Sequence, residues 1–391
     1  MKRRAAASAV LAGLLLCAAT PGTAAASQDG APNLIAGSAY LVAHGNLIAG
    51  HYYESFPGTA DWGLTIDGAL ALAATGDDDA ALSAMVAYMD GDGKDPSGAT
   101  VNDWTGIGTA NASGGAIGKE ALLAEVTGRN PRSFGGHDLI AALDASVCTR
   151  ASASCPAAGS YLNATSVFDQ ALGIMAQFRA GQASEAAAPV AYLEGLQSAD
   201  GSFPSLIPPS GGTDVDSTAM AVMALALAPG ARAAADVAAG ISWIASRQEH
   251  NGGFPNAGAE SINSTGLAIQ ALTLRAGVYR ARISAALAFL ASQQNGNGGF
   301  DADAGQPGSN LRASTQAVSG AAGPSFGTLR ISPGSPPAAS GHSGHRTTAA
   351  GIAAAVVVLL IFLVLQLRWR RRMLRTRLDS ADPPAPHQVS S

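Results

Sequence analysis

Cysteine, aromatic and charged residues are all scarce in this chain of 391 residues. It has three cysteines, Phe, Trp and Tyr make up 5% of it, and charged residues make up 13%. Stabilising a carbocation takes a pocket walled with aromatic rings, so the low aromatic content counts against that chemistry. The segment from Asp90 to Asp95 has alternating carboxylates, as calcium loops do, but lacks their later bidentate glutamate. We therefore expect a solvated loop there, no metal site and no cofactor.

Positive charge is scarce between residues 27 and 345. This region holds 13 Lys and Arg against 26 Asp and Glu, a net charge of −13, whereas the whole chain carries only −5 because the remaining residues are basic. An acidic surface repels phosphate groups. The region is therefore not expected to bind nucleic acid or anionic lipid.

The two ends of the chain are apolar and predict export followed by anchoring. Residues 1–26 combine Lys2-Arg-Arg, a short apolar stretch and small residues, the pattern of a secretory signal peptide. Residues 347–367 are uncharged and long enough to span a bilayer, and a basic cytoplasmic tail would follow at 368–391. A stalk rich in Pro, Gly and Ser would cover 324–346. The domain at 27–323 would then lie outside the cell, held at the cell membrane by one helix.

Two cysteines remain after the predicted signal peptide, which contains Cys17. Cys148 and Cys155 are seven residues apart. Exported proteins meet oxidising conditions in which such neighbours pair. The sequence predicts one local disulfide between them.

A motif with the spacing QxxxGxF occurs three times in the second half of the chain. The copies run from Gln197 to Phe203, from Gln248 to Phe254 and from Gln294 to Phe300. Their separation of about 46 to 51 residues indicates one supersecondary unit used repeatedly. We expect the glycine of each copy to end a helix outside the right-handed region, with the phenylalanine packed on the last turn.

Two kinds of predicted helix alternate along the chain. Helices rich in small residues include Leu64, Ser113, Ser166, Asp216, Asn263 and Arg312 near their starts, and amphipathic helices lie near 34–48, 78–90, 134–146, 185–198, 234–248 and 281–294. In the amphipathic set, apolar residues recur at steps of four and three, as in Val237, Ile241 and Ile244. The other set is apolar on nearly every side, as expected for an inner ring covered by outer helices. The sequence predicts an all-α (α/α)6 toroid of six helical hairpins.

The QxxxGxF motif resembles the QW motif of squalene-hopene cyclases and their relatives in the terpenoid cyclase and prenyltransferase toroid superfamily. The resemblance covers the three C-terminal repeats well and the first three only by helix pattern. It implies that the glutamine and the aromatic residue tie an outer helix to the next loop. It also implies that the inner helices turn their N-termini toward one mouth, where polar groups meet a ligand or substrate.

One inner-helix start is similar to a catalytic motif. The stretch from Thr213 to Ala221 resembles the DxDD-T-A-M-A segment of class II terpene cyclases, in which the middle acid protonates an alkene or epoxide. By this resemblance Asp216 would be the general acid, kept protonated by burial or by Asp214. Ser217 stands where the motif has its last acid, and squalene cyclases join two barrels where this chain has one. A terpene cyclase or mutase using Asp216 is therefore an alternative interpretation.

Other enzymes with this fold are disfavoured by the available side chains. A protein prenyltransferase takes its zinc ligands from Asp, Cys and His, and the two remaining cysteines are predicted to pair. A glycan-cleaving toroid needs two carboxylates across a cleft, and no such pair stands out from the helix starts.

A single toroid with inner helices of this type also resembles the α domain of the cobalamin carriers intrinsic factor and transcobalamin. That resemblance implies a domain that holds a bulky small molecule, corrinoid-like or another nutrient, without catalysis and could pass it to a membrane transporter. The polar contacts would be Asp67, Asp169, Gln170, Asp216, Asn263 and Gln270, with Trp62 and Trp104 as apolar walls. Ordinary helix capping by the residues at the helix starts and loop packing of the tryptophans remain open. A scaffold that contacts another protein or the cell wall is a third interpretation.

Overall fold

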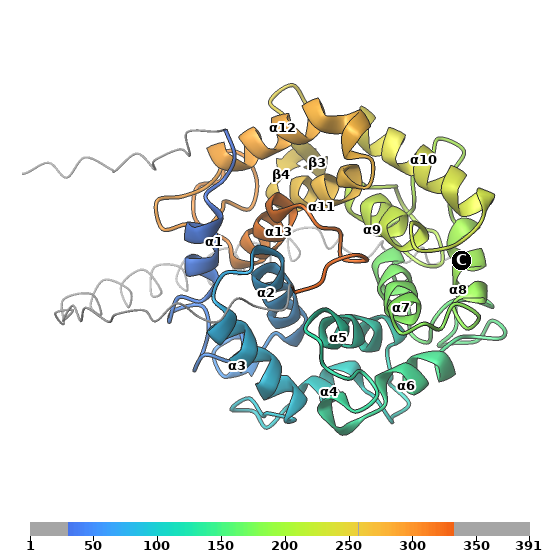
Figure 1. Cartoon of the computed structure of the whole chain (residues 1–391). Coiled ribbons are helices and arrows are strands. Elements are labelled where there is room, and N and C mark those ends of the chain that lie inside the picture. Colours follow the sequence, from blue (N-terminus) through green and yellow to red (C-terminus); the bar gives the residue numbers. More distant parts are fainter. Residues whose placement is uncertain (1–29, 257, 332–391) are drawn as a thin grey trace, which may run out of the picture. The chain divides into compact units, whose positions relative to one another are not determined.

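A computed structural model describes residues 30–256 and 258–331 of the chain. These residues form thirteen α-helices, one 3-10 helix and two short antiparallel hairpins, β1 (Glu54–Phe56) with β2 (Thr59–Ala60) and β3 (Phe254–Asn256) with β4 (Ala259–Ser261) (Figure 1). The predicted signal peptide and membrane anchor lie outside the described residues. Within them, no helix has both the length and the apolar character needed to cross a membrane.

Six helices form a closed inner ring. They are α2 (Trp62–Thr75), α5 (Gly114–Val126), α7 (Val167–Arg179), α9 (Val215–Leu225), α11 (Ile262–Thr273) and α13 (Leu311–Ala322). Each packs against the next in chain order, and α13 packs against α2 (Figure 1). Gly115 and Gly118 of α5 lie against Asp169 and Gly173 of α7 in the same order, so these neighbours run parallel. The small residues are needed because a Cβ on Gly118 would come within 2.7 Å of the Gly173 backbone.

Six further helices cover this ring from outside. They are α1 (Leu34–Leu41), α3 (Asp79–Asp90), α6 (Leu139–Ala145), α8 (Ala187–Glu194), α10 (Ala231–Ser246) and α12 (Ala276–Ser292). Each packs on an inner helix, with α1 on α13 and each of the others on the inner helix nearest in sequence. Val237, Ile241 and Ile244 of α10 are all buried, as their spacing predicted. The described residues therefore have the α/α-toroid fold.

Two predicted helices differ in the structure, and one helix was not predicted. The helix expected over 134–146 is interrupted, because Gly135 and Gly136 have φ angles of 60° and 79° and leave only a 3-10 turn, η1 (Phe134–Gly136), before α6. The helix expected over 34–48 ends at Leu41 as α1. A short helix, α4 (Val101–Thr105), was not predicted, and a side-chain capping box of Thr100 and Asp103 starts it.

The glutamines of the QxxxGxF motifs clamp neighbouring repeats together. Gln294 donates from Nε2 to the carbonyl oxygens of Gly298 at 3.0 Å and Asn33 at 2.9 Å. Gln197 makes the same pair of bonds with Gly201 and Asp236, and Gln248 makes it with Gly252 and Arg282. Because Asn33 caps α1, Gln294 joins the last repeat to the first and closes the ring.

The motif glycines let two backbones touch. Gly201, Gly252 and Gly298 have φ angles of 93°, 94° and 89°, so the predicted departure from the right-handed region is confirmed. The glycines do not end the helices, however, because the preceding outer helices stop several residues earlier. A Cβ on Gly298 would overlap the carbonyl oxygen of Ala36 in α1. Close contact with the next outer helix therefore explains the glycine.

The backbone N–H groups of the motif phenylalanines bond to side chains of the inner helices, and the expected packing of their rings on the preceding helix stays a prediction. The backbone N–H of Phe203 donates to Thr218 Oγ1, that of Phe254 to Thr265 Oγ1 and that of Phe300 to Ser314 Oγ. The first and third repeats do the same with Tyr53, bonded to Thr65 Oγ1, and Tyr161, bonded to Gln170 Oε1. All five rings are fully buried. Each of these five repeats thus anchors a loop on its inner helix through one aromatic residue.

The segment after α13 packs on the toroid. Phe326 and Leu329 are buried, Arg179 donates to the carbonyl oxygen of Gly327 at 3.0 Å, and Ile331 bonds to Val126 at the end of α5. The stalk predicted to begin at residue 324 therefore does not begin there, since residues 324–331 lie across the C-terminal ends of inner helices. The opposite end of the ring carries the inner-helix N-termini.

Candidate functional site at the mouth of the inner ring

Every inner helix starts at a side-chain cap. The caps are Asp61, Ser113, Ser166, Asp214, Ser261 and Asn310, and each accepts a hydrogen bond from the backbone N–H three residues later. Such a cap contributes about 0.5 to 2 kcal/mol to stability. Asp214, the second acid of the catalytic alternative, is therefore occupied as the cap of α9.

Asp216 lies two residues inside α9 and points toward α11. Its Oδ2 accepts from Asn263 Nδ2 at 3.0 Å and from Asn256 Nδ2 at 3.5 Å. The residue is half-buried, and Oδ1 is enclosed with no hydrogen-bond partner among the described residues. Asn263 holds the equivalent position on α11. The structure therefore brings together two of the predicted site residues, Asp216 and Asn263.

The surroundings of Asp216 favour its protonated form. Burial is the largest influence and, with the Asp214 carboxylate, it raises the pKa of Asp216 to about 6, while Ser264 and Asn263 act in the opposite direction. An ionised carboxylate is poorly stabilised away from water, which explains the sign. Burial and Asp214 are the two influences expected from the sequence. A carboxyl group with this pKa can donate a proton in weakly acidic solution.

An ion pair joins α2 and α5 one turn further in. Lys119 Nζ lies 2.7 Å from Asp67 Oδ1, and both side chains are largely buried. Asp67 was predicted as a ligand contact, but it is already paired with a lysine that the sequence analysis did not select. Both residues are the sixth after their helix caps, and that shared register could have identified Lys119.

A second ion pair crosses the contact between the last and first inner helices. Arg312 lies two residues inside α13, equivalent to Asp216, and its guanidinium is 2.9 Å from Asp61 Oδ2. Trp104 of α4 covers the start of α2, since a Cβ on Gly63 would lie 3.2 Å from its ring. Trp104 is 38% exposed, and its role as an apolar wall stays a prediction. Sequence reasoning missed Arg312.

Two residues that were predicted to contact a ligand instead form hydrogen bonds within the protein. Asp169 forms the capping box of α7, and its Oδ2 accepts hydrogen bonds from the backbone N–H groups of Thr165 and Ser166. Gln170 is fully buried on the outward face, where it accepts from Tyr161 and donates to the carbonyl oxygens of Gly159 and Pro189. The prediction of Gln170 as a ligand contact was wrong, because its amide is already satisfied inside the protein.

The remaining two predicted residues are buried. Trp62 is 3% exposed and packs against Tyr52, with ring centroids 5.7 Å apart, so its prediction as a wall of the mouth was wrong. Gln270 is fully buried in α11, and neither amide atom has a hydrogen-bond partner among the described residues. Its position deep in the helix separates it from the rim.

Side chains close the inner ring below the rim. Leu172, Met220 and Leu267 are equivalent to Asp67 in their repeats and are 8%, 2% and 0% exposed. Further along the helices, Met175 and Met223 are fully buried. The candidate site is therefore a shallow rim formed by Asp216, Asn263, the two ion pairs and Trp104.

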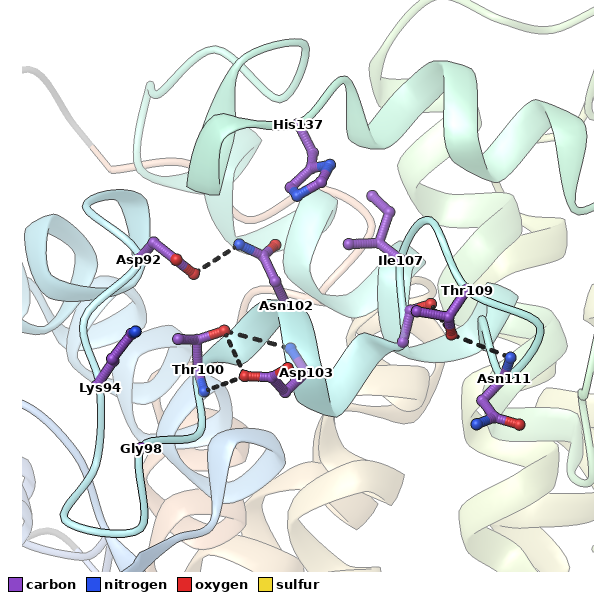
Figure 2. Close-up of a pocket in the computed structure, with 11 residues that line it drawn as sticks. Asp92, Lys94, Gly98, Thr100, Asn102, Asp103, Ile107, Thr109, Asn111 and His137 are labelled. Carbon is purple, nitrogen blue, oxygen red and sulfur yellow. Dashed lines mark hydrogen bonds between the residues drawn. The ribbon is translucent and has the colours of Figure 1, made fainter.

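A separate cavity of about 690 Å³ lies beside α4 (Figure 2). It is lined by Asp92, Lys94, Gly98, Thr100, Asn102, Asp103, Gly106, Ile107, Thr109, Asn111 and His137. No predicted site residue lines it. Elsewhere, the predicted disulfide is confirmed between Cys148 and Cys155. Within the described residues, no three His, Cys, Asp or Glu side chains are grouped closely enough to hold a metal ion.

Comparison with known proteins gives similarity at the level of the fold. Residues 155–305 match the family described as the prenyltransferase alpha-alpha toroid domain. No curated protein matches the chain in sequence.

Solved structures with the same fold are distant in sequence. The type II terpene cyclase MstE from Scytonema is 14% identical, with a TM-score of 0.54, over 74% of this chain and 96% of that one. MstE with geranylgeranyl dihydroxybenzoate, described as its substrate, gives 15% identity and a TM-score of 0.53 over 74% and 95%. A structure described as a glycosidase is 15% identical, with a TM-score of 0.51 over 74% and 96%. Identities this low show a shared fold only. The described part of the chain has the α/α-toroid fold, and residues 155–305 match the prenyltransferase alpha-alpha toroid domain.

Proposed function

We propose that this protein is a terpene cyclase-like enzyme that binds a prenyl compound at the rim of the inner ring and protonates it with Asp216. The observation that carries the proposal is a half-buried carboxyl group at an inner-helix start whose pKa is raised to about 6. Catalytic acids work best when their pKa lies near the working pH. No other described residue combines this pKa with a place at the rim.

The proposed reaction is an isomerisation started by proton transfer. The neutral Asp216 carboxyl gives its proton to a terminal alkene or epoxide, whose electron pair forms the new bond to hydrogen and leaves a cation. Another double bond of the same molecule attacks that cation and closes a ring. Loss of a proton to water or to the Asp216 carboxylate ends the sequence and restores the charge balance. Asn263 holds Oδ2 and so fixes the orientation of the acid.

Chain length does not oppose this proposal. The MstE structures are covered over 94–96% of their own chains, so a protein described as a type II terpene cyclase consists of about one such toroid. The compound described as the substrate of MstE, geranylgeranyl dihydroxybenzoate, carries a geranylgeranyl chain on an aromatic acid. We propose a substrate of the same class here, with the prenyl chain at the rim.

The second candidate is a toroid that captures a bulky molecule without changing it. The observation that favours it is the polar rim above a closed ring centre, with two ion pairs and few aromatic side chains to stabilise a cation. A corrinoid-like nutrient would suit such a surface, and a membrane transporter could receive it. The proposed setting is the same for both candidates: a membrane-anchored domain outside the cell, which protease accessibility on intact cells would test.

Product analysis distinguishes the two candidates. Full-length protein in detergent would be incubated with geranylgeranyl dihydroxybenzoate, squalene or geranylgeranyl diphosphate, and the extracts examined by mass spectrometry and NMR. A cyclised product of unchanged mass that disappears in Asp216→Asn supports the enzyme. The matched control is Asp78→Asn, which alters an exposed aspartate that makes no capping bond. Saturable stabilisation by cobalamin or cobinamide without any product would support capture instead.

A further inference from the structure

The second repeat lacks the aromatic anchor that the other five share. In the first and third repeats, Tyr53 and Tyr161 lie directly over Gly68 and Gly173, where a Cβ would overlap their rings. The residue of α5 equivalent to those glycines is Glu120. In the second repeat, a carboxylate therefore stands at the position that meets an aromatic ring in the first and third repeats.

Glu120 is buried without compensation. It is 0% exposed, and neither carboxylate oxygen has a hydrogen-bond partner among the described residues. Asn102 of α4 likewise has an enclosed Oδ1 with no hydrogen-bond partner among those residues. A polar group left unpaired in the interior is destabilising, and more so if it is charged. Two such oxygens side by side indicate a missing partner.

The unpartnered oxygens of both side chains converge beside Gly135. A Cβ built on Gly135 would lie 3.1 Å from Asn102 Oδ1 and 3.4 Å from Glu120 Oε1. Glycine leaves this space open, and its φ angle of 60° matches that choice. Asn102 is held in place by donating from Nδ2 to the carbonyl oxygen of Gly135 and to Asp92 Oδ1, at 2.9 and 2.8 Å. These two hydrogen bonds therefore hold the Asn102 side chain in a defined orientation, with Oδ1 toward Glu120.

The charges around this space are mainly negative. Burial, followed by the charges of Asp92 and Asp90, raises the pKa of Glu120 to about 8. Arg129 pairs with Asp90 at 3.5 Å. Lys94 and His137 line the cavity together with Asp92 (Figure 2). A cation among these groups would relieve both the repulsion and the unmet bonding of the oxygens.

The cavity of Figure 2 offers an entrance. Asn102 and Asp92 line it, and the dashed bond between them lies at its wall. Part of the neighbouring loop is firmly held, because buried Asp95 accepts from the backbone of Ala60 and Ala99 and so is not solvated as expected. Asp90 and Asp92 precede Asp95 in the same loop, and their charges act on Glu120.

We infer that Glu120 and Asn102, with Asp92 beside them, form a binding site for a hard divalent cation, with Ca²⁺ the best match. The unpartnered atoms of Glu120 and Asn102 are all oxygens, which Ca²⁺ prefers and which bind softer metals poorly. The described carboxylates are not grouped closely enough to serve alone, so amide, backbone and water oxygens complete the ligand set. From the sequence, no metal site was expected. Glu120 of α5 would supply the glutamate that the loop from Asp90 to Asp95 lacks.

Glu120 binds the ion as a carboxylate, because metal ligands of this type are deprotonated. None of the residues that form the site is proposed to act at the rim, so the site can be tested separately from the chemistry at Asp216.

Calorimetry and thermal unfolding of the full-length protein test this site. After treatment with a chelator, CaCl₂ should raise Tm saturably at pH 7, MgCl₂ less, and NaCl at equal ionic strength not at all. Calorimetry at pH 7 should show a saturable heat of CaCl₂ binding. Glu120→Gln keeps the shape of the side chain and should abolish both this heat and the rise in Tm.

Two comparisons make the result decisive. Glu249→Gln, at an exposed position, should leave Ca²⁺ binding unchanged. Asn102→Ala should weaken binding at least tenfold, because it removes the second oxygen. A Ca²⁺ response that persists in Glu120→Gln would place the site elsewhere, and no saturable response of the native protein up to millimolar Ca²⁺ would overturn the inference.

Discussion

The second repeat and the three C-terminal repeats solve the same packing problem with different residues. The C-terminal repeats each use a glutamine clamp, a glycine at close contact and a buried phenylalanine, and every one of these groups is satisfied. The second repeat instead places Glu120 in the interior with both oxygens unpaired. Regular repeats thus mark what the ring needs to close, while the departure from the rule marks a place where the molecule carries unmet polar groups.

The largest effect is expected from a substitution that disrupts the contact between the last repeat and the first. Gly298→Val adds a side chain that would overlap α1 at a backbone angle unfavourable for valine, so we expect a loss of more than about 3 kcal/mol or failure to fold. Gly305→Val is the control, because Gly305 has φ 81° but open space around it. It should cost only about 1 to 2 kcal/mol. Urea unfolding measures both, and equal losses would refute the close-contact explanation.

The next largest effect is expected from a substitution that removes one glutamine clamp without adding a steric clash. Gln294→Ala deletes three hydrogen bonds, two donated to carbonyl groups and one accepted from the backbone N–H of Asn33, and should cost about 1 to 3 kcal/mol. The side chain of neighbouring Gln293 bonds only to the adjacent Ser292, so Gln293→Ala should stay within about 0.5 kcal/mol. A similar loss for both variants in urea unfolding would show that the clamp has no special role.

The pH dependence of stability sharpens the contrast at Glu120. Its folded pKa, raised to about 8 mainly by burial and then by Asp92 and Asp90, exceeds the unfolded value. The folded state therefore holds its proton more tightly, and this contribution is lost as pH rises from about 4.5 through 8. In chelator, Glu120→Gln should reduce the fall in unfolding free energy between pH 5 and 8 by roughly 3 kcal/mol. Glu125, whose burial also raises its pKa to about 8, will leave a remaining slope. An unchanged slope would contradict the burial of an uncompensated Glu120.

The smallest stability effect is expected at the rim. Asp216 has a folded pKa raised to about 6, so stability is lost as pH rises from the unfolded value of 3.8 through about 6. The gain in unfolding free energy from Asp216→Asn should therefore be larger at pH 8 than at pH 5, by about 1 to 2 kcal/mol. Thermal unfolding at the two pH values measures this difference. Destabilisation at pH 8 would show that Asp216 serves mainly as an ion-paired or bonding group.

Much of the ring could be predicted because its signals are local. Small residues at a period near 50 indicate helices that touch, and the Gln, Gly and Phe of each motif act within one repeat and its neighbour. The break at Gly135 was missed because the amphipathic pattern continues across it. Residues 324–331 were taken for a stalk because their composition hides the two apolar side chains, Phe326 and Leu329, that bury.

The site was less predictable because it depends on helix register between repeats. Asp216 and Asn263 were selected by position and do lie together, but Lys119 and Arg312 matter only through partners on neighbouring helices. Gln170 looked like a rim residue, yet it is the fourth after its cap and faces the aromatic anchor outside the ring. A single acid such as Glu120 resembles a surface residue until the loops around it are placed.

The pH dependence of product formation by the native protein tests the central claim most directly. With geranylgeranyl dihydroxybenzoate or another prenyl substrate, we expect a cyclised isomer whose rate of formation is highest below pH 6 and falls about tenfold per unit above it, as the Asp216 acid is lost. Asp216→Asn should give no product at any pH. Product formation that continues in Asp216→Asn, or a rate that rises above pH 6, would contradict Asp216 as the proton donor.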